Sequence, residues 1–287
     1  MKVSVLILTL NEEQNIGRCL DALSWSDDVV VVDSFSSDRT VEIATRLGAR
    51  VVQREFIDFA NQRNFGLREC GLRHDWVLHL DADEVVMPQL RDEIAALGND
   101  PAIDGYRIAG RMMMGEKWLK HSGMFPVHQV RLTRRDGFRF EQVGHGQREG
   151  EGQRLATLRN NYLHYFFSKG LSDWFERHNR YSTDEARHAT VVGWPRLSQL
   201  VARDAPLRRR ALKALGFHLP FRPFLRFAYM YVLRRGFLDG RAGYEYSRLM
   251  SIYEAMIDMK VRELRRSCEI LVADDDVQPA CGGDVVR

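Results

Sequence analysis

The chain has 287 residues, of which 45% are hydrophobic and 28% charged, so it is long enough to bury a full core. Its formal net charge of +3 excludes a strong overall attraction to polyanions, and its four cysteines lack the CxxC spacing of common zinc sites. No run approaches the roughly 18 consecutive apolar residues of a membrane span, and the start of the chain indicates a first strand and not a signal peptide.

The first hundred residues alternate between strand and helix patterns. Continuous apolar runs are typical of strands that are covered on both faces. Asn11 and Asp38 are good helix caps, and Gly48 suits the position after a helix. The expected strands are Val3–Leu8, Val29–Val32, Arg50–Gln53 and Trp76–Leu80, and the expected helices cover residues 11–23, 40–47, 61–69 and 88–97. This repetition predicts an α/β fold with a parallel sheet, in which ligands bind beyond the carboxyl ends of the strands.

The rest of the chain changes character twice. Residues 101–165 contain shorter strand patterns among glycines and basic residues, which indicates a mixed half of the same domain. From Ser168 the pattern is helical, and residues 244–266 form a long amphipathic helix pattern. The composition of residues 271–287 predicts a disordered tail.

Three carboxylates, Asp81, Asp83 and Glu84, follow the fourth expected strand directly. Like charges packed together disfavour one another's ionisation, so a positive group is expected among them. Oxygen ligands in a loop at a strand end suit Mg²⁺ or Mn²⁺. An isolated Asp-x-Asp is more often a solvated turn or a helix cap. Its place after a fourth strand, with Asp33 ending the second, favours the cation site.

Four segments together resemble successive signatures of the family-2 glycosyltransferases. They are TLNEE at residues 9–13, VVVDSFSSDRT at 30–40, FANQRNFGL at 59–67 and LDADE at 80–84. The resemblance is greatest to the branch of lipopolysaccharide-core glucosyltransferases and exopolysaccharide transferases. It implies the GT-A fold, a Rossmann-like mixed sheet flanked by helices, with a helical C-terminal extension. The expected domains are 1–167 (a nucleotide-sugar half, 1–100, and an acceptor half, 101–167), a basic helical extension at 168–270 and the tail at 271–287.

The resemblance also implies roles for individual residues on the donor side. Thr9, Asn11 and Glu12 would line the nucleotide pocket, and Asp33 would hold the base or ribose. An alternative for Asp33 is a loop carboxylate that accepts hydrogen bonds from nearby backbone N–H groups. A second group would serve the diphosphate and the metal: Arg63 faces the pyrophosphate, Asp83 binds the metal, Asp81 contacts the ribose or the metal, and His164 is a further metal candidate.

The general base is less well marked. Family-2 members invert the anomeric centre, so a carboxylate or histidine must take the proton of the acceptor hydroxyl in one displacement. The chain departs from the family pattern because it has no Glu-Asp pair at the usual later position. The base candidates are Glu149, His145 and Glu141.

Residues 203–241 carry ten basic against two acidic side chains, interleaved with aromatic residues. A nucleic-acid surface lacks a recognised motif here, and a solvated basic face is the simplest alternative. An interfacial segment with aromatic side chains at headgroup depth fits best. The aromatic residues concerned are Phe221, Phe224, Phe227, Tyr229 and Tyr231. We expect a cytoplasmic enzyme that is peripheral on the inner face of the cell membrane.

The sequence thus predicts a metal-dependent inverting glycosyltransferase that uses a nucleotide-sugar donor and a glycan or lipid-linked acceptor. UDP is the default nucleotide from the family alone. One alternative is a sugar-phosphate nucleotidyltransferase, which is disfavoured because LNEEQN replaces the glycine-rich basic loop of that class. The other is a non-catalytic nucleotide-binding protein at the membrane.

Overall fold

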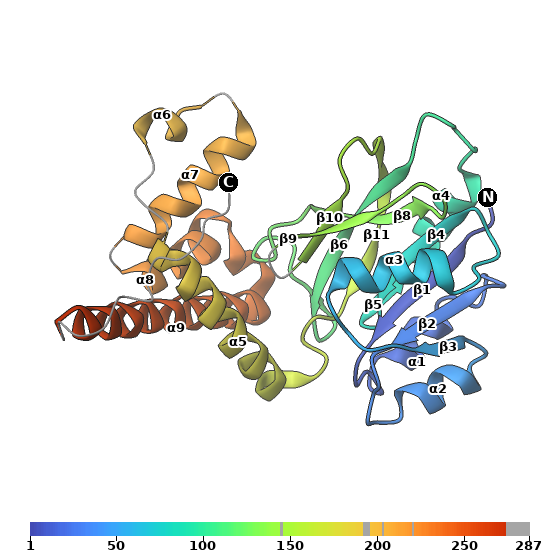
Figure 1. The fold of residues 1–287 in the computed structure, drawn as a ribbon, viewed down its shortest axis with the longest axis horizontal. Helices are drawn as coiled ribbons and strands as arrows, with labels where there is room; N and C mark the ends of the chain where they lie inside the picture. Colours follow the sequence, from blue (N-terminus) through green and yellow to red (C-terminus); the bar gives the residue numbers. More distant parts are fainter. Residues whose placement is uncertain (144–145, 192–195, 203, 220, 274–287) are drawn as a thin grey trace. The chain divides into compact units, whose positions relative to one another are not determined.

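The computed structural model describes residues 1–143, 146–191, 196–202, 204–219 and 221–273. Contacts divide the chain into two compact units, residues 1–169 and residues 170–287. We call them the N-terminal unit and the C-terminal unit and describe each by itself (Figure 1). Most of the expected tail, from residue 274 onward, lies outside the described residues.

The described part of the N-terminal unit is built on a mixed nine-stranded sheet of order β3-β2-β1-β4-β8-β6-β11-β5, with β7 paired to β6. Strands β1 to β4 are parallel, and β8 runs antiparallel between β4 and β6. The strands are β1 Ser4–Thr9, β2 Val29–Asp33, β3 Arg50–Gln53, β4 Trp76–Asp81, β5 Glu84–Val86, β6 Gly105–Met114, β7 Lys117–Trp118, β8 Val127–Arg134 and β11 Leu155–His164. A separate antiparallel pair consists of β9 Phe140–Val143 and β10 Gly146–Glu149.

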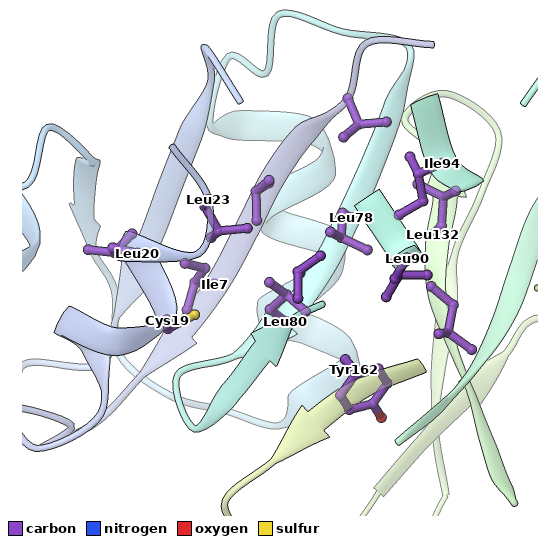
Figure 2. Packing of buried hydrophobic residues seen from close by; sticks show 14 of the residues in the cluster. Ile7, Cys19, Leu20, Leu23, Leu78, Leu80, Leu90, Ile94, Leu132 and Tyr162 are labelled. Carbon is purple, nitrogen blue, oxygen red and sulfur yellow. The ribbon is translucent and has the colours of Figure 1, made fainter. Parts of the chain in front are cut away.

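Helices cover both faces of the parallel part of this sheet, which is why β1, β2 and β4 are mostly apolar. Successive side chains of β1 belong to different cores: Val5 and Ile7 pack with α1 and α4, and Leu6 packs with α3. Figure 2 shows the first core, where Ile7, Leu78 and Leu90 lie among side chains from several elements. The helices are α1 Ile16–Asp21, α2 Thr40–Arg46, α3 Phe59–Glu69 and α4 Pro88–Ala96.

Local signals are confirmed in part. Gly48 has the positive φ of 85° expected after a helix. The N-cap of α2 is Arg39 and not the expected Asp38, although the carboxylate of Asp38 accepts a hydrogen bond of 3.0 Å from the backbone N–H of Thr40. The expected cap at Asn11 is wrong, because α1 begins at Ile16 and Asn15 precedes it. Asn11 instead takes a left-handed conformation with φ 54°, which asparagine tolerates better than most residues.

Gly66 allows α3 to lie very close to the sheet. A Cβ atom at this position would be 2.3 Å from the side chain of Leu6 on β1. Leu6 is fully buried, so a Cβ atom here would require a shift of the Leu6 side chain or of α3. The absent side chain therefore sets the distance between α3 and β1.

The C-terminal unit is helical. Its long helices α5 and α9 pack through Ala186, Ala189, Ile257 and Val261. Of the helices in the described residues, none has the length and hydropathy that crossing a bilayer requires. Its elements are α5 Gly170–Val191, α6 Leu197–Leu200, α7 Ala205–His218, α8 Arg222–Ala228, the π-helix η1 Tyr229–Leu233, the 3₁₀-helix η2 Gly236–Asp239 and α9 Gly240–Ala273.

Large apolar side chains are exposed over α8, η1 and η2. Phe221 is 79% exposed, Leu233 74% and Phe224 68%. In contrast, the rings of Phe227 and Tyr231 stack with centroids 5.2 Å apart. We call the exposed set the apolar patch; it consists of Phe221, Phe224, Leu225, Val232, Leu233, Phe237 and Leu238.

Candidate active site

The carboxyl ends of β1, β2 and β4 meet at one edge of the sheet. Thr9 lies opposite Asp33, and Leu8, one residue before Thr9, lies opposite Asp81. The structure thus brings together the residues expected at the ligand edge of a parallel sheet.

Asp33 is fully buried and holds the loop that follows β2. Its carboxylate accepts hydrogen bonds from the hydroxyl of Thr9 at 2.8 Å and from the backbone N–H of Ser36 at 2.9 Å. The side-chain amide of Gln53 donates a third, at 3.2 Å. These contacts correspond to the structural alternative for Asp33, and its role toward a base or ribose stays a prediction.

Asn11 and Glu12 shape the loop after β1. The side-chain oxygen of Asn11 accepts a hydrogen bond of 2.8 Å from the backbone N–H of Ser37. Glu12 forms an ion pair of 2.5 Å with Lys169, whose ammonium also donates to the carbonyl of Leu10 at 3.4 Å. Lys169, far along the chain, therefore brings a positive charge to the proposed nucleotide loop.

The acidic cluster after β4 already has positive partners. The two carboxylate oxygens of Asp81 accept hydrogen bonds of 2.7 Å each, one from Arg63 and one from Arg131. Arg131 also donates to Glu84, which is fully buried. Because an unpaired buried charge is very costly, these guanidinium groups explain how Asp81 and Glu84 coexist.

A β-bulge in β8 positions Arg131. Tyr106 lies opposite Leu132 but the next residue, Arg107, lies opposite Val130, so Arg131 is the extra residue. A bulge redirects one side chain and is common beside active sites. The bulge coincides with the one arginine of β8 that reaches the acidic cluster.

The two carboxylates have opposite pKa shifts. Partial burial alone would raise the pKa of Asp81, but Arg131 and Arg63 outweigh it and lower that pKa well below its usual range. Burial dominates for Glu84 and, despite Arg131, raises its pKa to about 7. Asp81 is therefore a fixed negative charge, whereas Glu84 is neutral in part of the population at neutral pH.

Asp83 and His164 form a second pair at the same edge. The Oδ2 atom of Asp83 lies 3.4 Å from Nε2 of His164, because β11 pairs with β5 so that His164 is opposite Glu84. Burial alone would lower the pKa of His164, but Asp83, with Glu84 and Asp81, raises it to about 9. His164 is thus the positive partner of Asp83.

These two side chains fit a divalent cation only in part. Among the residues that the structure describes, no group of three or more His, Cys, Asp and Glu side chains could hold a metal ion. Mg²⁺, however, is usually bound through one or two carboxylates, with waters and substrate phosphates as the other ligands. Asp83 and His164, both partly accessible at the ligand edge, could supply one oxygen and one nitrogen ligand once His164 loses its proton.

A pocket of about 440 Å³ extends from Asp81 toward β9 and β10. Arg63, Arg107, Arg131, Arg148 and Glu149 are among its lining residues, together with Phe59, Asp81, His128, Gln129, Val130, Phe140, Gly146 and Gln147.

The three base candidates differ in their relation to this pocket. Glu149 lines it and is paired with Arg107. Burial alone would raise the pKa of Glu149, but its own backbone N–H and Arg107 lower it, so the group is ionised at neutral pH. Glu141 is not among the lining residues and pairs with Arg139 at 3.1 Å. His145 lies outside the described residues.

The sequence reasoning missed Arg131 and Lys169. One signal existed for Arg131, because a lone arginine stands in the otherwise apolar VRL of an expected strand. Three carboxylates nearby in the fold require such a cation. For Lys169 no comparable signal exists, since only folding brings it to Glu12.

The family model of glycosyl transferase family 2 matches residues 4–161, more than half of the chain. The chain belongs to this family. Together with the mixed sheet flanked by helices, family membership confirms the GT-A fold. An uncharacterized glycosyltransferase of Rickettsia typhi is 25% identical to this family-2 chain over 98% of its length and 93% of the relative.

The chain is also similar to one further curated protein and to two solved structures. The lipopolysaccharide core biosynthesis glycosyltransferase LpsC of Rhizobium meliloti is 27% identical over 70% of this chain and 77% of the relative. Residues 1–349 of S. aureus TarS cover 93% of this chain and 92% of that chain with a TM-score of 0.43 and 17% identity. Glucosyl-3-phosphoglycerate synthase from Mycobacterium tuberculosis, in complex with Mg²⁺ and UDP, is similar with a TM-score of 0.34 and 25% identity. The match covers 38% of this chain and 44% of that chain.

Proposed function

We propose that this family-2 glycosyltransferase moves a hexosyl group from a nucleotide-diphosphate sugar to a glycan or lipid-linked acceptor, with inversion, in lipopolysaccharide or exopolysaccharide synthesis. The observation that carries the proposal is the meeting of Asp81, Asp83, Arg63 and His164 at the carboxyl edge of a family-2 sheet. The family match favours glycosyl transfer over nucleotidyl transfer. The similarity to LpsC supports the biosynthetic context.

On the donor side, Thr9, Asn11, Glu12 and Asp33 would form the nucleoside end of the site. Arg63 would face the diphosphate, where a guanidinium matches phosphate oxygens. Asp83 and His164 would hold Mg²⁺ or Mn²⁺, with Asp81 beside them. The bound ion would stabilise the negative charge that develops on the leaving diphosphate.

On the acceptor side, Glu149 would take the proton of the attacking hydroxyl. Two observations support Glu149 over Glu141: it lines the pocket that Asp81 and Arg63 also line, and it is ionised. Arg107, its partner, would keep the carboxylate oriented.

The enzyme would bind its acceptor at a membrane surface. The apolar patch of the C-terminal unit supports this proposal, because exposed patches of this kind mark interaction sites. Arg235 is exposed within the same segment, and guanidinium groups beside an apolar patch suit anionic lipid headgroups. The protein would then act peripherally on the inner face of the cell membrane.

The donor proposal is tested by a thermal-shift screen of nucleotide sugars with and without Mn²⁺. A ligand that binds only the folded state raises the melting temperature. We expect a metal-dependent rise with a nucleotide-diphosphate sugar, UDP sugars first. Asp83→Ala should abolish this rise and lower nucleotide release at least about 100-fold, since it removes stabilisation of the leaving group.

The control is Asp92→Ala, which removes an exposed carboxylate on α4, where Asp92 contacts its neighbour Arg91. It should behave like the unchanged protein. If Asp83→Ala retains full turnover, or if no nucleotide sugar raises the melting temperature, the proposal is wrong.

A further inference from the structure

The pocket extends beyond the residues assigned to the donor. Arg63 and Asp81 lie at its donor end, whereas Arg107 comes from β6 and Arg148 from β10. Neither β6 nor β10 carries a residue of the proposed nucleotide site. The distal part of the pocket is therefore available to the other substrate.

Guanidinium groups dominate the charge of this pocket. Four arginines line it, against the carboxylates of Asp81 and Glu149. The partners behind them, Glu84 and Glu141, reduce this excess. Because Glu141 is shared by Arg148 and Arg139, five guanidinium groups still face four carboxylates among the described residues. An anion is favoured at such a surface.

Two of the arginines have donor capacity left for a ligand. Arg63 is only 1% exposed, and its Nη1 atom has no hydrogen-bond partner among the residues that the structure describes. Such buried donors are rare unless a ligand or water satisfies them. Arg148 touches Glu141 only at 3.5 Å, and its side chain is 53% exposed. That contact is long for a charge-assisted hydrogen bond.

We propose that the distal part of this pocket binds a phosphate or carboxylate group of the acceptor through Arg148, so that the acceptor is an anionic sugar or glycan. This inference rests on the proposed function for identifying the ligand as an acceptor. The anion would hold the acceptor in the distal part of the pocket, which Glu149 also lines. Phe59, which also lines the pocket and is 40% exposed, offers apolar surface for a sugar ring.

Three probes that differ in one group test the inference: glucose, glucose 6-phosphate and glucuronate. Their affinities for the protein are measured by ligand-observed NMR titration, with and without saturating UDP and Mn²⁺. We expect at least one anionic probe to bind about ten-fold or more tightly than glucose, because charge-assisted hydrogen bonds are the stronger ones. The probe that gains affinity distinguishes phosphate from carboxylate.

Arg148→Gln should reduce this preference about ten-fold, and binding of the anionic probe should persist when UDP fills the donor site. Arg139→Gln is a matched control, because Arg139 pairs with the same Glu141 and is 65% exposed but does not line the pocket. It should leave the preference unchanged. Both variants must melt like the unchanged protein.

Three results would overturn the inference: equal affinity for all three probes, equal losses in both variants, or displacement of the anionic probe by UDP. The last would assign the arginines to the donor diphosphate and leave the proposed function intact. Conversely, if no nucleotide binds, the proposed function fails, while an anion preference that depends on Arg148 would still support the anion site itself.

Discussion

Arg131 determines the electrostatics of the site at the scale of single residues. Without it, Asp81 would lose one of its two guanidinium partners, and Glu84 would lose the guanidinium that donates to it. With it, Asp81 and Glu84 are paired with guanidinium groups, and Asp83 is paired with His164. A metal ion is therefore not needed to hold the cluster together.

A second prediction at the scale of single residues concerns Glu149 as the proposed general base. A general base contributes typically 10²–10⁴-fold to the rate, whereas a residue that only binds donor changes affinity. Glu149→Gln should therefore lower release of the nucleotide from the donor by about 100-fold or more, while the thermal shift caused by the donor stays the same.

Glu141→Gln is the comparison, since Glu141 is the rival carboxylate of the same antiparallel pair. It should keep most of the activity. The opposite ranking of the two variants would move the base to Glu141, and loss of the donor-induced shift in Glu149→Gln would make Glu149 a binding residue.

At the scale of elements, Asp28 joins the amino ends of the first strands. It is buried and accepts hydrogen bonds from the hydroxyl of Ser4 at 2.6 Å, the backbone N–H of Arg73 at 2.8 Å and Arg50 at 2.9 Å. Burial alone would raise its pKa, but these donors outweigh burial and lower it. The folded state thus stabilises the ionised carboxylate.

Asp28→Asn should lower the free energy of unfolding by roughly 2 kcal/mol at neutral pH, because a charged buried acceptor is lost. A lowered pKa stabilises the folded state fully above the pKa of the unfolded chain, about 3.9, and this gain decreases as the pH falls from there through the lower pKa of the folded state. The deficit of the variant should therefore shrink in acid. Urea unfolding at about pH 7 and about pH 3.5 measures it.

Asp21→Asn, at an exposed position on α1, provides the reference for a neutralised surface carboxylate. A deficit for Asp28→Asn that is the same at both pH values would show that its charge does not contribute to stability.

The elements that the sequence predicts well are those set by local patterns. The apolar runs of β1, β2 and β4 needed no tertiary information, because a strand covered on both faces is apolar at nearly every position. Asp81 at the ligand edge followed from the strand before it. Asn11 was misjudged because a good capping residue also suits a left-handed turn.

Other parts of the site depend on pairings that no local pattern reveals. His164 reaches Asp83 only because β11 pairs with β5, and Arg131 reaches Asp81 only through the bulge in β8. The pocket is lined by residues of α3 and β4 from the first half of the N-terminal unit and of β6, β8, β9 and β10 from its second half. A family resemblance supplied His164, whereas Arg131 required the structure.

At the scale of the whole molecule, we expect one unit to carry out the reaction and the other to bind the membrane. The candidate chemistry lies in residues 1–169, and the apolar patch lies in residues 170–287. If the patch docks on lipid, the protein should sediment with vesicles that contain anionic lipid and less with neutral ones, and salt should weaken the binding.

Replacing both Phe224 and Leu233 with serine should lower vesicle affinity about ten-fold or more, since burial of each side chain contributes roughly 1.5–3 kcal/mol. Val191→Ser is the control, because Val191 is 79% exposed on α5 outside the patch. Equal sedimentation of all three proteins would refute membrane docking, and a concentration-dependent dimer lost in the double variant would assign the patch to self-association.

The missing side chain at Gly66 has a consequence for evolution and engineering. Arg63 lies on the same helix, one turn earlier, and its Nη2 atom is 2.7 Å from Oδ1 of Asp81. Even a methyl group at position 66 would push α3 away from β1 and so move the guanidinium of Arg63 away from its carboxylate. Position 66 is uncharged and is not among the residues that line the pocket, yet the size of its side chain affects the Arg63–Asp81 pair. A variant there would resemble a catalytic defect.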